Sequence, residues 1–522
     1  MAKGPSAYRT AASPLTLAAF AIAAAASAPL IAVLASLSEP FGATIAHVAT
    51  TTGPGYAAGT FGLMAATGAC ASLIGVAAAL CVSLADFPGR RVLSLALAAP
   101  LAVPAYIAAY AYGDFFGPFG FVARAGGPLI DIKSFWGAVL VLTMTLYPYV
   151  YLAARAAFDA RSGAYLEAAR LAGRPPLRAS LSLLAPSAAP AIIGGALLVM
   201  METAADFGVA DYFGVPTLSV GVFRTWNAFG DLTAAAQLAS LLVLVAIILV
   251  TLDTAARRGG AFEGARGRRI RRRLPLRGVG AVAAFLFCAL PVALGAVIPV
   301  AVIAASWDGG SSMRGLGAAL GNSALAAAAG AAIIIVASAL LAYAARAANG
   351  PLTGAALRVA TLGYAVPGAV IAIGVFSAGA ALFGAGAVAA ATGLGALLYA
   401  YAARFMTAGL NVLSGGLAGV SPAVDGAARV LGAGPARLAL RIHAPLMAPS
   451  LAAAGIILFV DITKELPATL ILRAFNFETL ATRVYRLAGD ERLAEAAPAA
   501  LTLIGLGVLP VALLGAIRGR ND

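Results

Sequence analysis

Long apolar stretches alternate with short polar connections along nearly the whole chain of 522 residues. A helix needs about 20 mostly apolar residues to cross the hydrocarbon core of a bilayer. Twelve stretches meet this requirement, six on each side of the middle of the chain. They are residues 13–36, 60–84, 93–113, 135–154, 188–206, 232–252, 278–304, 320–345, 358–380, 384–404, 450–470 and 496–517. The pattern predicts an all-α polytopic membrane protein with about twelve transmembrane helices.

The composition excludes several classes of protein. Apolar residues make up 61% of the chain and charged residues 11%, whereas a soluble globular chain carries roughly 25% charged residues. A soluble enzyme, a disordered chain and a fibrous protein are therefore excluded. The three cysteines, Cys70, Cys81 and Cys288, lie in apolar runs without metal-ligand spacing. We therefore predict neither a disulfide framework nor a bound metal or cofactor.

Basic residues gather in alternate connections between the apolar stretches. If the N-terminus is cytoplasmic, most of the 35 lysines and arginines fall on the cytoplasmic side. This positive-inside bias predicts that both termini are cytoplasmic, and it accounts for the net charge of +14. The densest basic run, residues 256–277, fits a juxtamembrane linker beside an anionic leaflet better than an RNA-binding tract. No nucleic-acid partner is expected.

The chain contains an internal repeat. When it is shifted against itself by 259 residues, polar and proline positions coincide without a gap from the fourth span to beyond the fifth. The coinciding pairs are Pro186 with Pro445, Glu202 with Asp461, Asp206 with Glu465, and Arg224 with Arg483. We therefore predict two homologous halves, 1–255 and 278–522, each with six spans. An even number of spans places both halves the same way up in the membrane.

A further repeated feature lies upstream in the third span of each half. Val103 and Pro104 recur as Val366 and Pro367. A proline inside a span removes a helical hydrogen bond, so we predict that both spans are kinked there.

A polar loop recurs between the fourth and fifth spans of each half, at residues 162–190 and 421–449. Each copy has an acidic residue, two alanines, a glycine and a later proline. A glycine at positive φ ends a helix, and a following proline fits the start of the next one. We predict a short cytoplasmic helix and a rigid bend in each loop. The repeated residues are Glu167, Ala168, Ala169, Gly173 and Pro186 in the first copy, and Asp425, Ala427, Ala428, Gly432 and Pro445 in the second.

These two loops resemble the EAA loop of the permease subunits of bacterial ABC importers. The resemblance implies a type I importer-like fold in the inner membrane, and it implies that both loops dock onto an ATPase subunit through the ten residues just given. The second copy departs from the family pattern, because Gly426 stands where the glutamate is expected and the acid is Asp425. Two copies of the ATPase, one under each half, are expected to use ATP and Mg.

The resemblance also concerns the substrate. Residues 201–226 and 461–485 resemble the ferric-iron-type permeases with fused halves. This implies import of Fe3+ delivered by a periplasmic binding protein to the outer loops, about 207–231 and 473–495. The permeases for thiamine and other small solutes have a similar architecture and remain the alternative.

The chain itself is not expected to be an enzyme. A Walker A motif needs a lysine at the end of a glycine-rich loop, and none of the three lysines follows one. An ion-gradient-driven secondary transporter would also suit twelve spans in two parallel halves, but it gives no reason for the duplicated loop. A membrane scaffold or sensor does not explain the duplication.

Charged residues at span ends are costly, so they are usually paired or functional. Two hypotheses compete for five such residues. They pair with each other and with Arg224 and Arg483 to hold the halves in register, or their carboxylates meet a cation in transit, since ferric ions prefer oxygen ligands. The sequence favours the first hypothesis. The five residues of this candidate translocation pathway or half–half interface are Glu202, Asp206, Asp461, Lys464 and Glu465.

Overall fold

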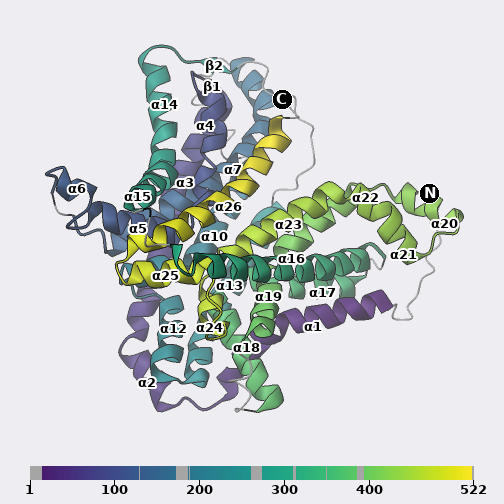
Figure 1. Cartoon of the computed structure of the whole chain (residues 1–522). Coiled ribbons are helices and arrows are strands. Elements are labelled where there is room, and N and C mark those ends of the chain that lie inside the picture. The colour runs from purple at the N-terminus through teal and green to yellow at the C-terminus, as the bar shows by residue number, and fades with distance from the viewer. Residues whose placement is uncertain are drawn as a thin grey trace.

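The computed structural model describes residues 14–128, 130–171, 186, 188–259, 273–307, 309, 313–347, 350–384 and 393–519. Nearly all of its regular structure is helical (Figure 1). The helices of the first half are α1 (Pro14–Ala35), η1 (Ser36–Ser38), α2 (Ala43–Thr50), α3 (Gly53–Leu84), α4 (Arg90–Ala96), η2 (Ala99–Ala102), α5 (Ala105–Phe116), α6 (Phe121–Arg124), α7 (Phe135–Leu171), α10 (Ala189–Ala205), α11 (Gly208–Tyr212), α12 (Leu218–Phe229) and α13 (Leu232–Gly259).

The second half repeats much of this order. Its helices are α14 (Val279–Val292), η4 (Ala293–Val297), α15 (Ile298–Ser306), α16 (Leu316–Ala347), α17 (Pro351–Ala360), η6 (Leu362–Ala365), α18 (Gly368–Phe383), α19 (Leu394–Ala418), α20 (Pro422–Val430), α21 (Pro435–Arg437), η8 (Leu438–His443), α22 (Ala444–Leu446), α23 (Ala448–Thr463), α24 (Pro467–Leu472), α25 (Leu480–Gly489) and α26 (Leu493–Gly519). Two short parallel strands, β1 (Ala85–Asp86) and β2 (Leu274–Pro275), pair the end of α3 with the segment that precedes α14.

The predicted all-α polytopic fold is confirmed, but the count of twelve spans is not. Among the described residues, seven helices are long and apolar enough to cross a membrane, or up to nine if each of two bent pairs is one span. The fifth predicted span is α10, which has only 17 residues, and the ninth is largely α18, with 16. The tenth, 384–404, lies partly outside the described residues. The helix there, α19, carries Arg404 in its middle, which lowers its hydropathy.

Both third spans are broken at the repeated proline. In the first half, η2 ends at Ala102, Val103 is extended, and Pro104 caps the N-terminus of α5. In the second half, η6 ends at Ala365, and Val366 and Pro367 take the same roles before α18. Proline disfavours a helical residue before it, so the chain turns at this point. The predicted kink is a full break, with an angle of 92° between the pieces in the first half.

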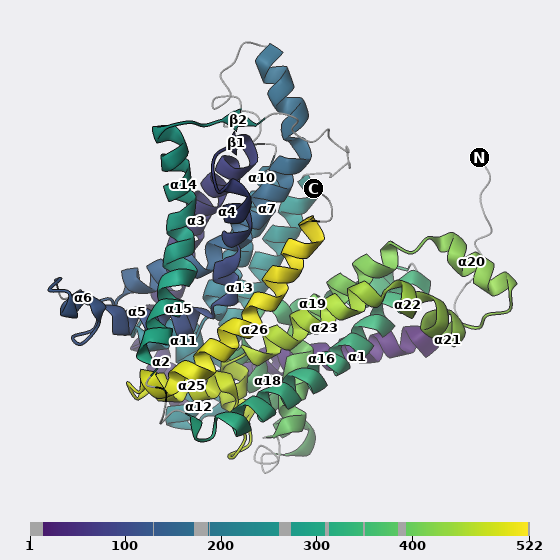
Figure 2. The same ribbon diagram turned by 45° about the horizontal axis from the view of Figure 1, so that its top comes forward.

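The two halves exchange their first helices (Figures 1 and 2). Helix α1 packs against α16, α17 and α18 of the second half, while α14 and α15 pack against α3, α4 and α5 of the first. The contacts are close, because a Cβ atom on Gly374 would clash with the carbonyl oxygen of Pro29. The same holds for Gly295 and the carbonyl oxygen of Met144. The halves therefore interlock and do not stand as separate bundles.

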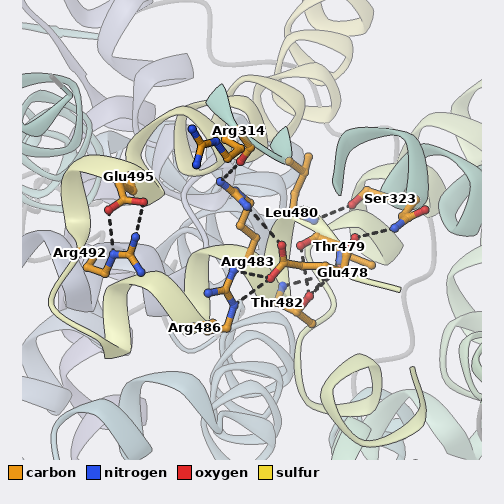
Figure 3. Close-up of polar contacts among 11 residues, drawn as sticks. Arg314, Ser323, Glu478, Thr479, Leu480, Thr482, Arg483, Arg486, Arg492 and Glu495 are labelled. Carbon is orange, nitrogen blue, oxygen red and sulfur yellow. Dashed lines mark hydrogen bonds and ion pairs between the residues drawn. The ribbon is translucent and has the colours of Figure 1, made fainter. Parts of the chain in front are cut away.

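The structure corrects the ungapped register of the repeat at its far end. Thr217 caps α12 and Thr479 caps α25. In matching contacts, the amide of Leu218 donates to Thr60 Oγ1 over 2.8 Å, and the amide of Leu480 donates to Ser323 Oγ over 2.7 Å (Figure 3). The turn before α25 is therefore longer than the turn before α12.

This longer turn changes which arginines are equivalent. Arg224 corresponds to Arg486, and the predicted match with Arg483 is wrong. Arg224 forms an ion pair with Asp211, an acid just beyond the fifth span, as the pairing hypothesis expects of this arginine. The buried Arg483 pairs with Glu478 (Figure 3).

Candidate functional site

A cavity of about 240 Å³ lies where the ends of α10 and α23 meet, at the junction of the two halves. It brings together all five residues of the predicted pathway, together with Arg404 from α19. Sequence reasoning missed Arg404, although an arginine inside an apolar span was a usable signal. The charged residues of the lining are Glu202, Asp206, Arg404, Asp461, Lys464 and Glu465.

Two of these acids have structural roles, and the roles are equivalent in the two halves. Glu465 accepts hydrogen bonds from the amides of Ala468 and Thr469, over 3.1 and 3.0 Å, at the start of α24. Asp206 accepts hydrogen bonds from the amides of Val209 and Ala210, over 3.0 and 3.1 Å, at the start of α11. Carboxylates in this position satisfy amides that have no partner within the helix.

Glu465 also forms an ion pair with Arg404, over 2.7 Å. The carboxylate of Glu465 is 1% exposed, so burial makes this pairing necessary. For Asp206 and Glu465, the hypothesis that the charges hold the structure together is therefore favoured.

Glu202 and Asp461 occupy equivalent positions on α10 and α23 and face the same cavity from opposite halves. Both side chains are partly exposed to it. Within the described part of the chain, the carboxylate of Asp461 accepts no hydrogen bond, and no group of three or more His, Cys, Asp and Glu side chains is placed to hold a metal ion. Unlike Asp206 and Glu465, these two acids do not cap a short helix, so their carboxylates have no such structural role.

Lys464 links the two halves inside the cavity. Its Nζ donates a hydrogen bond over 3.1 Å to the carbonyl oxygen of Leu101, which belongs to the first half. This carbonyl lies just before the break at Pro104, where the helical hydrogen-bond pattern is interrupted. The ammonium group thus binds an acceptor that the broken span makes available.

The second polar loop has the predicted form. Its helix, α20, starts after Ser421, whose hydroxyl accepts a hydrogen bond from the amide of Ala423. Its last residue is Val430, and Gly432, which follows the C-cap, has a φ of 79°. The amides of Gly432 and Ala433 donate hydrogen bonds back to carbonyl oxygens of the last turn. Pro435 then begins α21. The predicted helix stop at the glycine and the helix start at the following proline are confirmed in this loop.

Asp425 lies on the inner side of α20 and holds the loop to the end of α16. Arg346 donates to both of its carboxylate oxygens, over 2.9 and 3.0 Å, and His443 Nε2 lies 2.9 Å from Oδ1. His443 is buried, and its Nδ1 lies 3.0 Å from the hydroxyl of Tyr343. The carboxylate that the resemblance assigns to ATPase docking is therefore already bonded within the chain.

The second loop exposes four large apolar side chains, which we call together the α20 surface. They are Val430 and Leu431, which are 88% and 85% exposed, and Leu440 and Leu446. Of the other predicted docking residues, Ala427 and Pro445 are exposed, whereas Ala428 is on the buried side of α20. Large exposed apolar side chains on an otherwise polar loop mark a surface for protein contact.

The first loop is described only in part. Glu167, Ala168 and Ala169 lie in the last turns of α7. Gly173 lies outside the described residues, and Pro186 is exposed.

The ion pair of Asp425 predicts that the stability of the second loop depends on pH. The hydrogen bonds from Arg346, with a further contribution from His443, hold the pKa of Asp425 below its ordinary value. The contact therefore stabilises the loop at and above about pH 4, and this stabilisation is lost as the pH falls through the lowered pKa. The protection of the amides of residues 422–430 against hydrogen exchange, relative to the intrinsic rate at the same pH, should fall below about pH 4.

The variant Asp425→Asn should raise this exchange about tenfold at neutral pH, because a charged hydrogen bond is lost. Arg429→Gln, at an exposed position on the same helix, is the control and should leave the exchange unchanged. Equal exchange in wild type and Asp425→Asn would show that the ion pair does not hold the loop.

Comparison with known proteins places these features in a family context. No family model matches the chain. The chain is 24% identical over 439 residues to the Fe(3+)-transport system permease protein FbpB 2 of Haemophilus influenzae, which covers 82% of this chain and 83% of the relative. This chain is homologous to ABC transporter permeases. The match reaches into both halves, and the predicted resemblance is confirmed at this level.

Two shorter matches agree with this assignment. The chain is 27% identical over 191 residues to a protein of Salmonella choleraesuis named as a putative 2-aminoethylphosphonate transport system permease, PhnU. It is 25% identical over 173 residues to the sulfate transport system permease protein CysT of Salmonella typhimurium. These matches cover 34% and 31% of this chain and 67% and 62% of the relatives. Such permeases are transport subunits and not enzymes, as predicted.

Proposed function

We propose that the chain is the permease subunit of an ATP-driven importer of ferric iron in the bacterial inner membrane, with both termini cytoplasmic. The observation that carries this proposal is the cavity that Glu202 and Asp461, equivalent acids of the two halves, both line. Carboxylate oxygens suit a hard cation such as Fe3+. The name of the relative that matches both halves, a Fe(3+)-transport permease, supports the same substrate.

The size of the cavity favours a small ion over a larger organic solute. Its volume of about 240 Å³ lies below the roughly 300–1,000 Å³ of pockets for drug-sized ligands. Its lining carries four carboxylates and two basic groups, so the local field favours a cation. Thiamine or another small solute is the second candidate, because permeases for different solutes share this architecture.

The continuity of the helices supports a mechanism. The second loop leads through η8 and α22 into α23, with a bend of 77°, and α23 carries Asp461 in its last turn (Figure 2). The first loop likewise precedes α10, which carries Glu202. An ATPase subunit bound to each loop would therefore push directly on the helix that bears the cavity acid.

Two ATPase copies that close on ATP and Mg would move both loops together and shift the cavity between outward and inward access. A periplasmic binding protein would deliver the ion to the outer loops. ATP chemistry would belong to the ATPase, and the permease would contribute binding, coupling and the path.

Reconstitution tests this function. The permease would be placed in liposomes with its cognate ATPase and binding protein, and uptake of radioactive iron would be measured. Uptake should need ATP, the binding protein and an ATPase with an intact Walker A lysine. Iron uptake that follows an imposed ion gradient without the ATPase would favour a secondary transporter, and uptake of thiamine in place of iron would favour the second candidate.

A further inference from the structure

Another cavity, of about 580 Å³, lies at the edge of the protein and shares no lining residue with the central one. Its walls come from both halves. The end of α5 and α6 belong to the first half, whereas α15 and the start of α26 belong to the second. Helix α5 packs against both α6 and α15, and α6 projects to the left beyond α5 in Figure 1. The cavity therefore sits where the exchanged helix of the second half meets the first half.

The floor of this cavity is apolar. Ile298, Ala301, Val302 and Ala305 line it from one face of α15, and their spacing is that of a helical stripe. Ile303, on another side of the helix, is buried in the protein core. The two alanines leave space where larger side chains would fill it. An alkyl chain is the chemical group that such a floor accommodates.

The rim of the cavity is charged with both signs. Asp114 and Glu491 supply two carboxylates, and Arg124 supplies one guanidinium group. Glu491 is held at a φ of 60°, and it is the one residue other than glycine with positive φ in the described part of the chain. The rim thus combines acceptors for an ammonium group with a donor for a phosphate.

The position of the cavity identifies what can reach it. It lies at the outer ends of α5 and α15 in the predicted topology, where the spans give way to loops. Phe119, Phe121 and Trp307 stand exposed around it, at 89%, 61% and 46%, and such aromatic residues are typical of the membrane–water interface. A cavity with an apolar floor at this level opens toward lipid.

We propose that this cavity binds one phosphatidylethanolamine molecule from the outer leaflet. The ammonium of the headgroup would lie between Asp114 and Glu491, its phosphate would meet Arg124, and one acyl chain would follow the stripe on α15. A phosphatidylglycerol headgroup would bring no cation to the two carboxylates, and a choline headgroup has no N–H to donate. This inference depends on the membrane topology and not on the identity of the transported solute.

Bound lipid would join the two halves at the exchanged helix. Native mass spectrometry tests the proposal with permease extracted from bilayers of equal parts phosphatidylethanolamine, phosphatidylglycerol and phosphatidylcholine. Wild type should retain one phosphatidylethanolamine. The double variant Asp114→Asn with Glu491→Gln should lose this retention about tenfold relative to phosphatidylglycerol.

A second variant tests the floor and leaves the rim charges in place. Ala305→Phe should reduce retention of phosphatidylethanolamine, because the ring occupies the space of the acyl chain. Glu495→Gln is the matched control on α26, since Glu495 pairs with Arg492 outside the cavity, and it should retain lipid as wild type does. Thermal unfolding of each variant shows that it is folded.

Equal retention of the three lipids by wild type would overturn the proposal. Unchanged retention in Ala305→Phe would overturn it as well. If the double variant does not fold, lipid retention by wild type and by Ala305→Phe decides whether the cavity binds phosphatidylethanolamine.

Discussion

Neutralising Glu202 and Asp461 together, as Glu202→Gln with Asp461→Asn, is expected to reduce ATP-dependent iron uptake by about tenfold to a hundredfold. The two carboxylates face one cavity from equivalent positions of the two halves. In the double variant, a cation in transit would therefore have neither carboxylate as a ligand. Each single variant should have a smaller effect, because one carboxylate remains. Uptake by proteoliposomes gives the measurement, and co-purification with the ATPase reports assembly.

Controls separate transport from structure. Glu39→Gln removes a carboxylate at an exposed position outside the cavity and should transport normally. Glu465→Gln is expected mainly to lower the temperature of unfolding, since this residue caps α24 and pairs with Arg404. Normal uptake in a well-assembled double variant would rule out the acidic pair as part of the path. Failed assembly would instead show that the pair holds the halves together.

Placing a charge on the α20 surface, as Val430→Asp with Leu431→Asp, is expected to weaken ATPase binding about thirtyfold or more. Buried apolar anchors contribute most to such interfaces, and a desolvated carboxylate is costly there. Both side chains are almost fully exposed in this chain, so the substitutions should not disturb its own fold. Co-purification and ATPase stimulation would both fall.

The matched control lies on the opposite side of the membrane in the predicted topology. Phe475 is 96% exposed between α24 and α25, and Phe475→Asp should leave ATPase binding intact. Undiminished binding in the Val430/Leu431 variant would contradict docking at this loop. An equal loss in Phe475→Asp would indicate a general defect of the altered proteins.

Local backbone chemistry made part of this structure predictable. Gly432 and Pro435 fix the end of one helix and the start of another, and their effect depends only on near neighbours. The repeat placed Glu202 and Asp461 at equivalent sites, and the structure brings them to one cavity. The candidate site could therefore be predicted from helix start and stop residues and from the internal repeat.

Features that depend on tertiary packing were predicted only in part. The repeated Pro104 and Pro367 predicted a kink in each third span, but its extension to a full break depends on neighbouring helices that cover the bend. The role of Arg404 depends on Glu465, a partner far along the chain. The corrected register at Thr479 follows from a longer turn, which an ungapped comparison cannot detect.

The exchanged helices have a consequence for how the protein is made. Helix α1 is synthesised well before α16, α17 and α18, which follow only after the basic linker. During translation α1 can pack against α13 of the first half but must wait in the bilayer for these later partners, so the first half cannot complete its packing alone. Joining the two halves in a single polypeptide keeps this waiting helix beside the correct partner until that partner emerges.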